Sequence, residues 1–286
     1  MKIARRCVCC LSENLSGSQA VLAPFVAYRV FGWEPAEITA DWGLRDIRPG
    51  HAYAACATLE CADCGALFLD MRFDDEEMAA LYAGYRDERY CAARERFEPG
   101  YAERNARFAE GSPYMPEIEA FLASHVPAAP RVLDFGGDTG LNTPFRGSAA
   151  VHHVHDISGL ETVAGAVSVS LAQAGAETYD LIVSSQVLEH VSDPRAMLAD
   201  IAALARPETK IYLEVPHEDV VRLHGSERPI GPRKRLWHEH VNFFTPESLD
   251  AMLAAAGLSR VARQSIPVVA GGREVRVMCV LATRVA

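Results

Sequence analysis

The sequence predicts an α/β fold with a mostly parallel sheet, preceded by a small cysteine-rich region. From residue 131 onward, short apolar runs alternate with helix-like segments, a pattern typical of parallel βαβ units. The first run ends in the glycine-rich turn Asp134-Phe-Gly136-Gly137-Asp-Thr-Gly140, as a buried strand that enters a ligand-binding loop does. We therefore expect residues 129–286 to form one α/β domain.

A second acidic residue predicts which kind of ligand this turn binds. Asp156 ends the run Val151-His-His-Val-His-Asp156. It follows Asp134 by roughly 20 residues, the spacing at which nucleotide-binding α/β folds place a carboxylate that bonds ribose hydroxyls. Asp138 lies within the turn, and its charge would repel a pyrophosphate, which argues against a dinucleotide.

The length and charge of the chain limit the classes of protein to which it can belong. The 286 residues suffice for one large and one small domain, and 28 basic against 38 acidic residues give a net charge of −10. This acidic balance argues against a nucleic-acid partner. The longest early apolar segment, Val21 to Trp33, is interrupted by Arg29, so no membrane span is expected. The start of the chain lacks the pattern of a signal peptide, and we expect a cytoplasmic protein.

Two cysteine pairs predict a structural zinc site. Cys7 and Cys10 form one C-x2-C pair, and Cys61 and Cys64 form the other. Two such pairs deliver four thiolates tetrahedrally to zinc and leave no open coordination position. We expect residues 1–70 to form a zinc-ribbon domain, with an insertion that loops out between the pairs. Buried free cysteines are the alternative.

Residues 71–128 are expected to form a helical arm and linker. Asp75 to Tyr82 has the acidic first turn of a helix, and Pro116 to His125 is a second helical segment. Tyrosines and arginines are mixed between them, Tyr85 and Tyr90 among them. Such a mixture is typical either of a solvated helical linker or of an arm that folds over a ligand pocket, where tyrosine supplies an apolar wall and a hydroxyl.

The glycine turn and a later strand resemble the class I S-adenosylmethionine (SAM)-dependent methyltransferases. The first motif of that family reads Asp/Glu-x-Gly-x-Gly-x-Gly, and Asp138 replaces its middle glycine here. The apolar run Tyr179 to Ser184 is followed by Ser185-Gln186-Val-Leu-Glu-His190-Val-Ser-Asp-Pro, which closely resembles the strand-four signature of the family. The resemblance implies a Rossmann-like sheet of seven strands, one of them antiparallel.

The same resemblance implies SAM as the cofactor. SAM carries an ammonium group and a sulfonium but no phosphate, so the acidic Asp138 is compatible with it. The adenine contact is left open between backbone groups and Gln173. The residues that the resemblance assigns to the cofactor are Asp134, Gly136, Gly137, Gly140, Asp156, Ile157, Ser185 and Gln186.

The segment Trp237-His238-Glu239-His240 is similar to the Tyr-His-Glu-His element of sugar C-methyltransferases, which also carry the cysteine pairs. The similarity implies that His240 is a base, with Glu239 as its neighbour, and we add His190 to the catalytic candidates. A histidine suits this role because its unperturbed pKa of about 6.5 is close to working pH. Trp237 replaces the tyrosine, and those enzymes continue beyond the length of this chain. A structural role for His240 therefore stays open.

Five basic residues precede this segment: Arg222, Arg228, Arg233, Lys234 and Arg235. They predict either a solvated loop or an anion clamp for a phosphate on the acceptor. The substrate-binding candidates are Tyr85, Tyr90, Arg233, Arg235, Trp237 and His238. Some family members bind a divalent ion through Glu-x-x-Glu-His, but Gln186 takes the first position here, so no catalytic metal is expected.

The expected function is methyl transfer from SAM to an oxygen or carbon of a sugar, linked to a nucleotide or to a cell-envelope polysaccharide. Such an enzyme mainly positions the donor and the nucleophile while a base removes one proton. One alternative is a small-molecule methyltransferase of secondary metabolism. The other is a non-catalytic SAM-fold module whose zinc ribbon binds a protein or nucleic acid.

Overall fold

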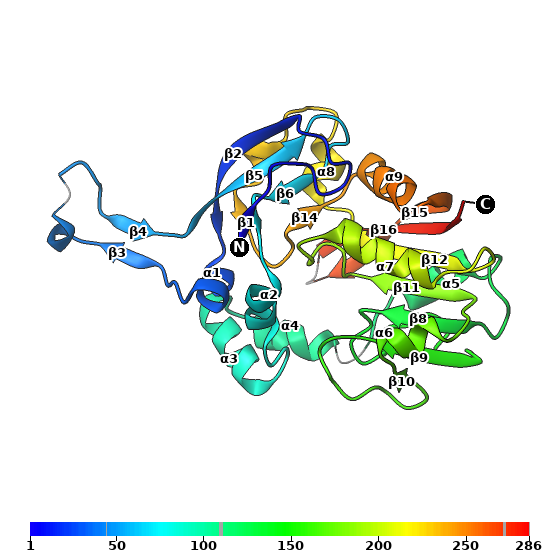
Figure 1. Ribbon diagram of the computed structural model, residues 1–286. Coiled ribbons are helices and arrows are strands. Elements are labelled where there is room, and N and C mark those ends of the chain that lie inside the picture. The colour runs from blue at the N-terminus through cyan, green and yellow to red at the C-terminus, as the bar shows by residue number, and fades with distance from the viewer. Residues whose placement is uncertain (44, 109–110, 271–272, 286) are drawn as a thin grey trace.

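The computed structural model describes residues 1–43, 45–108, 111–270 and 273–285, and its larger sheet has seven strands and lies on the right in Figure 1. The strand order is β10-β9-β8-β11-β12-β16-β15. The first five run parallel, and β16 is antiparallel to both of its neighbours, as predicted. The strands are β8 (Arg131–Phe135), β9 (Val151–His155), β10 (Val167–Ser168), β11 (Leu181–Ser185), β12 (Lys210–Pro216), β15 (Leu258–Ala270) and β16 (Arg273–Arg284).

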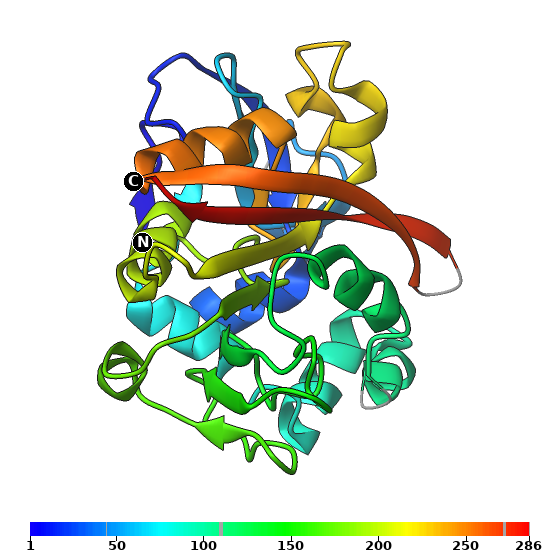
Figure 2. The same ribbon diagram turned by 90° about the vertical axis from the view of Figure 1, so that its right-hand side faces the viewer.

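Helices cover both faces of this sheet, which is why its central strands are mostly apolar, with polar residues such as Asp134, Ser185 and Glu214 towards their carboxyl ends. In β11, Ile182 points to one face and packs with α7 (Pro194–Leu204) and α9 (Pro246–Ala255). Its neighbours Leu181 and Val183 point to the other face and pack with α5 (Met115–Leu122). The short α6 (Leu171–Gly175) lies beside β9. Figure 2 shows the long pair β15 and β16 reaching beyond the other strands.

Helix starts follow the signals present in the sequence. Pro194 opens α7 directly after Asp193, whose side chain accepts a hydrogen bond from the Ala196 N–H. Thr245 and Ser248 cap α9 reciprocally. The helix predicted at Pro116 to His125 is confirmed as α5, although it ends at Leu122.

A second sheet of five strands has the order β13-β2-β5-β6-β14 and draws on distant parts of the chain. Its strands are β2 (Leu15–Leu22), β5 (Ala55–Cys61), β6 (Leu67–Leu69), β13 (Leu236–Trp237) and β14 (Asn242–Phe243). Trp237 and Phe243 enter its core beside Leu22, Leu67 and Leu69. The cysteine-bearing region therefore builds its sheet together with residues 236–243, which the sequence analysis assigned to the α/β domain.

The insertion between the cysteine pairs is largely structured. It contains β2, then α1 (Pro24–Phe31), β3 (Ala36–Ile38), the 3-10 turn η1 (Ala40–Trp42), β4 (Gly50–Ala52) and most of β5. Strands β3 and β4 pair with each other in a ribbon that projects from the body of the molecule (Figure 1). Phe25 and Val26 of α1 are fully buried, so the apolar segment starting at Val21 is part of the core.

The arm consists of three helices, α2 (Asp75–Tyr82), α3 (Glu88–Phe97) and α4 (Tyr101–Phe108). The predicted start of α2 is confirmed, with Asp74 and Glu77 capping it reciprocally. The remaining elements are β1 (Lys2–Ile3), which pairs with β7 (Met71–Arg72), the helix α8 (Asp219–His224) and the 3-10 turn η2 (Gly231–Arg233). No helix in the described part of the chain is both long and apolar enough to cross a bilayer.

Candidate functional site

The glycine turn after β8 is packed so tightly that side chains would not fit. A Cβ on Gly136, whose φ is 83°, would lie 2.7 Å from Cγ2 of Val187. A Cβ on Gly137 would lie 2.3 Å from Cγ of Asp134, and one on Gly140 would lie 2.8 Å from Val154. The glycines therefore allow the turn to pack closely against Asp134, against β9 and against the segment that follows β11.

Asp156 at the end of β9 faces the glycine turn. Its Oδ2 accepts the Asp138 N–H at 2.9 Å, and its Oδ1 accepts the Ser158 N–H at 2.7 Å. Each oxygen keeps a further lone pair, so the carboxylate can also accept hydroxyl groups of a ligand. Ile157 beside it is 92% exposed. The predicted ribose carboxylate and its neighbour are therefore placed where a nucleoside could bind.

Asp134 is buried beneath the turn. Thr143 donates a hydrogen bond from Oγ1 to Oδ2 of Asp134 at 2.5 Å, and the same hydroxyl contacts Nε2 of His152 at 2.8 Å. Burial raises the pKa of Asp134 to about 7, and the Thr143 hydrogen bond opposes that shift. Asp134 thus supports the turn from below.

Asp138 points to the arm. Its Oδ2 lies 3.0 Å from Nη1 of Arg86, whose guanidinium carbon is 4.8 Å from the centre of the Tyr85 ring. Burial raises the pKa of Asp138, while the Arg86 charge opposes the shift. The residue that departs from the family pattern therefore joins the glycine turn to the segment between α2 and α3. Sequence reasoning did not identify Arg86.

The ends of β11 and β12 meet at a buried carboxylate. Ser185 and Gln186 both donate hydrogen bonds to Oε1 of Glu214, at 3.0 and 2.9 Å. Glu214 is the partner of Ser185 in the parallel ladder, and it was not among the predicted site residues. An acidic residue at the carboxyl end of an apolar strand is a signal that could have identified it.

The turn after β11 brings His190 beside the segment 238–240. The ring centres of His190 and His240 are 4.6 Å apart, and those of His238 and His240 are 4.7 Å apart. Nδ1 of His240 lies 3.3 Å from Oε1 of Glu218. Burial lowers the pKa of His240, but the Glu218 hydrogen bond and nearby carboxylates outweigh it and raise the pKa overall. The predicted histidines do come together, and Glu218 is an unforeseen partner.

His190 is held as a neutral ring. Its Nδ1 lies 2.9 Å from the Tyr82 hydroxyl and 3.2 Å from the Glu239 carbonyl oxygen. Burial, followed by the charge of His240, lowers the pKa of His190 to about 3. Tyr82 ends α2, so the arm reaches this cluster as well as the glycine turn.

Two glutamates of the cluster differ in their surroundings. Glu189 is buried, and within the described residues neither of its carboxyl oxygens has a hydrogen-bond partner. Burial raises the pKa of Glu189 to about 7. Glu239 forms an ion pair with Arg94 of α3. Burial alone would raise the pKa of Glu239. The hydrogen bond from His238 and the charges of His238 and Arg94 outweigh burial and hold that pKa well below its usual range.

Side chains of these residues can also be grouped as metal ligands. Ligand atoms of Glu189, His190 and His240 lie within 4.8 Å of one another, as do those of His238, Glu239 and His240. Nitrogen and carboxylate donors of this kind suit a divalent ion such as zinc. The Gln186 amide takes no part in this group, because its Nε2 bonds to Glu214.

The four predicted zinc ligands are grouped as well. Sγ of Cys7 lies 3.5 Å from Sγ of Cys64, and Sγ of Cys10 lies 3.6 Å from Sγ of Cys61. All four sulfurs lie within 4.8 Å of one another. A tetrahedral zinc with bonds of about 2.3 Å separates its sulfurs by about 3.8 Å, so the donor set fits that ion.

Several predicted substrate-binding residues lie elsewhere. Trp237 is fully buried and donates from Nε1 to Thr58 at 2.7 Å. Tyr90, in contrast, is buried against Tyr85 and accepts a hydrogen bond from Arg94, the partner of Glu239, at 3.3 Å. Arg233 pairs with Glu227. Arg235 bonds to the carbonyl oxygen of Pro232, so the structure does not join Arg233 and Arg235 in a shared anion clamp. Tyr85 and His238 remain at the site.

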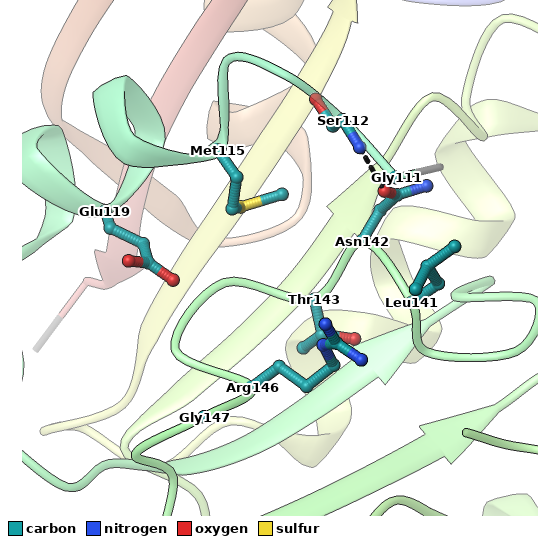
Figure 3. A pocket seen from close by; sticks show the side chains of 9 residues that line it. All are labelled: Gly111, Ser112, Met115, Glu119, Leu141, Asn142, Thr143, Arg146 and Gly147. Atoms are coloured by element: carbon teal, nitrogen blue, oxygen red, sulfur yellow. Dashed lines mark hydrogen bonds between the residues drawn. The ribbon is translucent and has the colours of Figure 1, made fainter. Parts of the chain in front are cut away.

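A cavity of about 230 Å³ borders the segment after the glycine turn (Figure 3). Ser112 and Asn142 are hydrogen-bonded across it at 2.7 Å, and Thr143, the partner of Asp134, lines it. The cavity is smaller than the usual ligand site of about 300–1,000 Å³.

Comparisons with known proteins agree with this arrangement. Ubiquinone biosynthesis O-methyltransferases from Parvibaculum lavamentivorans and Aeromonas salmonicida are 34% and 33% identical over 94 and 86 residues. These matches cover 31% and 29% of this chain and 36% of each relative, so the chain spans about a third of their length. Neither relative supports the predicted similarity to sugar C-methyltransferases.

A solved structure shares the fold. The 1,6-didemethyltoxoflavin-N1-methyltransferase of Burkholderia thailandensis, with bound 1,6-didemethyltoxoflavin and S-adenosylhomocysteine, aligns with a TM-score of 0.52 and 20% identity. The alignment covers 78% of this chain and 97% of that one. A family model described as a methyltransferase domain matches residues 82–262, from the end of α2 into β15. This match spans more than half of the chain, which therefore belongs to the methyltransferase domain family.

Proposed function

We propose that the protein is a SAM-dependent methyltransferase that acts on a small molecule. The observation that carries the proposal is the His240–Glu218 pair, which lies beside the turn after β11, on the same side as the glycine turn. Family membership and the S-adenosylhomocysteine bound to the toxoflavin enzyme support the choice of cofactor. The protein thus combines a nucleoside-type site with a candidate base.

The residues around the glycine turn suit SAM. Asp156 would accept hydrogen bonds from ribose hydroxyls, and the exposed Ile157 offers an apolar contact to the adenine. Gly136 and Gly137 let the turn pack closely on Val187 and Asp134, which fixes its position beside Asp156. Ser185 and Gln186 would face the methionine end. When bound, SAM supplies a methyl group on a sulfonium, which the acceptor atom takes by in-line displacement.

His240 is the residue we assign to proton removal. Glu218 contacts Nδ1 of His240, which leaves Nε2 available to accept a proton from the acceptor. His190 stays neutral beside it, and Arg94 keeps Glu239 ionised, so neither is a suitable proton carrier near pH 7. We therefore propose that His190 and Glu239 orient His240 and stabilise its charged form.

The acceptor must carry a proton that a histidine can remove. A phenol or enol hydroxyl meets this condition, and so does a carbon beside a ketone. The relatives are named as O-methyltransferases, which favours a hydroxyl acceptor. The similarity of residues 237–240 to the sugar C-methyltransferase element keeps keto sugars among the candidates. Arg233 and Arg235 give no support to a phosphate on the acceptor, since their partners lie elsewhere.

The test combines binding and turnover. Isothermal titration should give micromolar affinity for S-adenosylhomocysteine, and radiolabelled methyl transfer should then be screened over catechols, phenols and keto sugars. His240→Ala should lower turnover by about 10²–10⁴, the contribution of a general base, and change S-adenosylhomocysteine affinity less than about twofold. Failure of folded protein to bind either SAM or S-adenosylhomocysteine would sink the proposal. Undiminished turnover in His240→Ala would remove His240 as the base.

We further propose that Cys7, Cys10, Cys61 and Cys64 hold one structural zinc. The fit of the four sulfurs to a tetrahedral ion supports this. The site has no ligand position left for a substrate, and it packs against α7 and α9. Its role would be to fix the second sheet against the α/β domain.

A further inference from the structure

Glu214 is a buried carboxylate at the carboxyl end of β12, with 2% of its surface exposed. Tyr114, Ser185 and Gln186 donate hydrogen bonds to its Oε1 at 2.9, 3.0 and 2.9 Å, and Tyr212 donates to Oε2 at 2.6 Å. Both oxygens act as acceptors, as in an ionised carboxylate. All four donors are neutral, so hydrogen bonds alone spread this charge within the described part of the chain.

The position of Glu214 relates it to the ligand site. In an open α/β sheet, ligands bind at the carboxyl ends of the strands, and Glu214 lies at that end beside Ser185. A buried carboxylate with only neutral partners is costly to desolvate. A cationic group of a ligand would offset part of that cost, because Coulomb interactions are strong in a protein interior.

Glu214 also fixes what its neighbours present to a ligand. The Gln186 amide donates Nε2 to Glu214, and the Gln186 backbone N–H bonds to the Glu214 carbonyl oxygen at 2.9 Å. Gln186 has a φ of 57°, which is unusual for a residue with a side chain. Because the amide nitrogen and the Ser185 hydroxyl hydrogen are both engaged, these residues present oxygen acceptors. Acceptors beside a negative charge suit a positively charged ligand.

We propose that Glu214 is a positioning residue that makes the cofactor site prefer SAM over S-adenosylhomocysteine. This inference rests on the proposed function. The sulfonium gives SAM one more positive charge than S-adenosylhomocysteine, so the Glu214 charge stabilises SAM more strongly. The same difference in charge favours the release of S-adenosylhomocysteine after the methyl group has been transferred.

Isothermal titration of the full chain with SAM and with S-adenosylhomocysteine tests the proposal. In Glu214→Gln, which keeps the shape and removes the charge, the preference for SAM should fall about tenfold, or about 1.4 kcal/mol. Glu60→Gln is the matched control, since Glu60 is 3% exposed and accepts the Gly231 N–H in the second sheet. Its preference should equal that of the wild type.

The variant Glu214→Asp gives a second test that does not depend on whether Glu214→Gln folds. The aspartate keeps the charge, so the preference should stay within about twofold of the wild type while both affinities fall. An unchanged preference in Glu214→Gln, or a lost preference in Glu214→Asp, would overturn the inference and leave the proposed function intact. Wild-type protein that binds neither ligand would overturn both.

Discussion

At the scale of single residues, the buried Asp134 makes the stability of the protein depend on pH. Its pKa in the folded protein is about 7, above the ordinary aspartate value, because it is buried. Between about pH 4 and 7 the folded protein therefore binds a proton that the unfolded chain has released. The contribution of this residue to the free energy of unfolding is present below about pH 4 and is lost as pH rises through 7.

Asp134→Asn should remove this dependence. The amide oxygen can still accept the Thr143 hydrogen bond, and no charge is buried at high pH. The variant should gain stability relative to the wild type as pH rises from 5 to 8, by an amount on the order of 1–3 kcal/mol. Urea unfolding of the ligand-free protein at pH 5, 6, 7 and 8 measures it. Asp200→Asn on the surface is the control, and a parallel pH dependence in Asp134→Asn and wild type would contradict the assignment.

A second residue-scale prediction concerns Glu218. Its hydrogen bond is the main influence that raises the pKa of His240 against burial. In Glu218→Gln that pKa should fall, so the acidic limb of the pH–rate profile should move to lower pH. The rate on the plateau should drop about tenfold or more, because the ring loses its orienting carboxylate. If the acidic limb of the pH–rate profile did not move in Glu218→Gln, a group other than His240 would control it.

At the scale of elements, the Arg86–Asp138 ion pair fastens the arm to the glycine turn. Both side chains are partly exposed, so the pair should contribute less than about 1 kcal/mol to global stability. Arg86→Ala should instead raise hydrogen exchange in α2 and α3 and weaken S-adenosylhomocysteine binding severalfold. Arg96→Ala, which breaks the exposed pair with Glu34, is the control and should change neither. Unaltered exchange in Arg86→Ala would show that the arm is held by other contacts.

The helices and strands differ in how well the sequence predicts them. The β11 run and the α9 cap were predictable because apolar continuity and capping residues act within a few neighbouring positions. Strands β13 and β14 have two residues each, too few for a periodic pattern, and their pairing with β2 and β6 is a tertiary event. Trp237 was therefore predicted at the ligand although it fills the second sheet.

The same distinction holds for the candidate site. The glycines and Asp156 were predictable because a strand-turn motif places them locally. The Arg86–Asp138 and Glu218–His240 contacts join segments far apart in the sequence, and only the folded chain brings them together. Local patterns thus predict a cofactor side of the site, and they named one partner in each of these contacts.

At the scale of the whole molecule, the second sheet connects the proposed zinc site to the candidate base. The cysteine pairs flank β2 and β5, and this sheet also contains β13 and β14, which bracket residues 238–241. Thr245 at the start of α9 donates a hydrogen bond to the Cys64 carbonyl oxygen at 2.6 Å. Loss of zinc should therefore disturb the His240 segment more than the glycine turn, which belongs to the other sheet.

Metal removal tests this connection. Elemental analysis should give about one zinc per chain, and chelation should lower the melting temperature by several degrees, since structural zinc contributes directly to folding. At temperatures where the chelated protein stays folded, methyl transfer should be lost while S-adenosylhomocysteine affinity changes little. Cys61→Ser should reproduce this result, and Cys91→Ser, outside the cluster, should keep both zinc and activity. If chelation abolished cofactor binding together with turnover, this would contradict the prediction. Both sheets, and not only the His240 segment, would then depend on zinc.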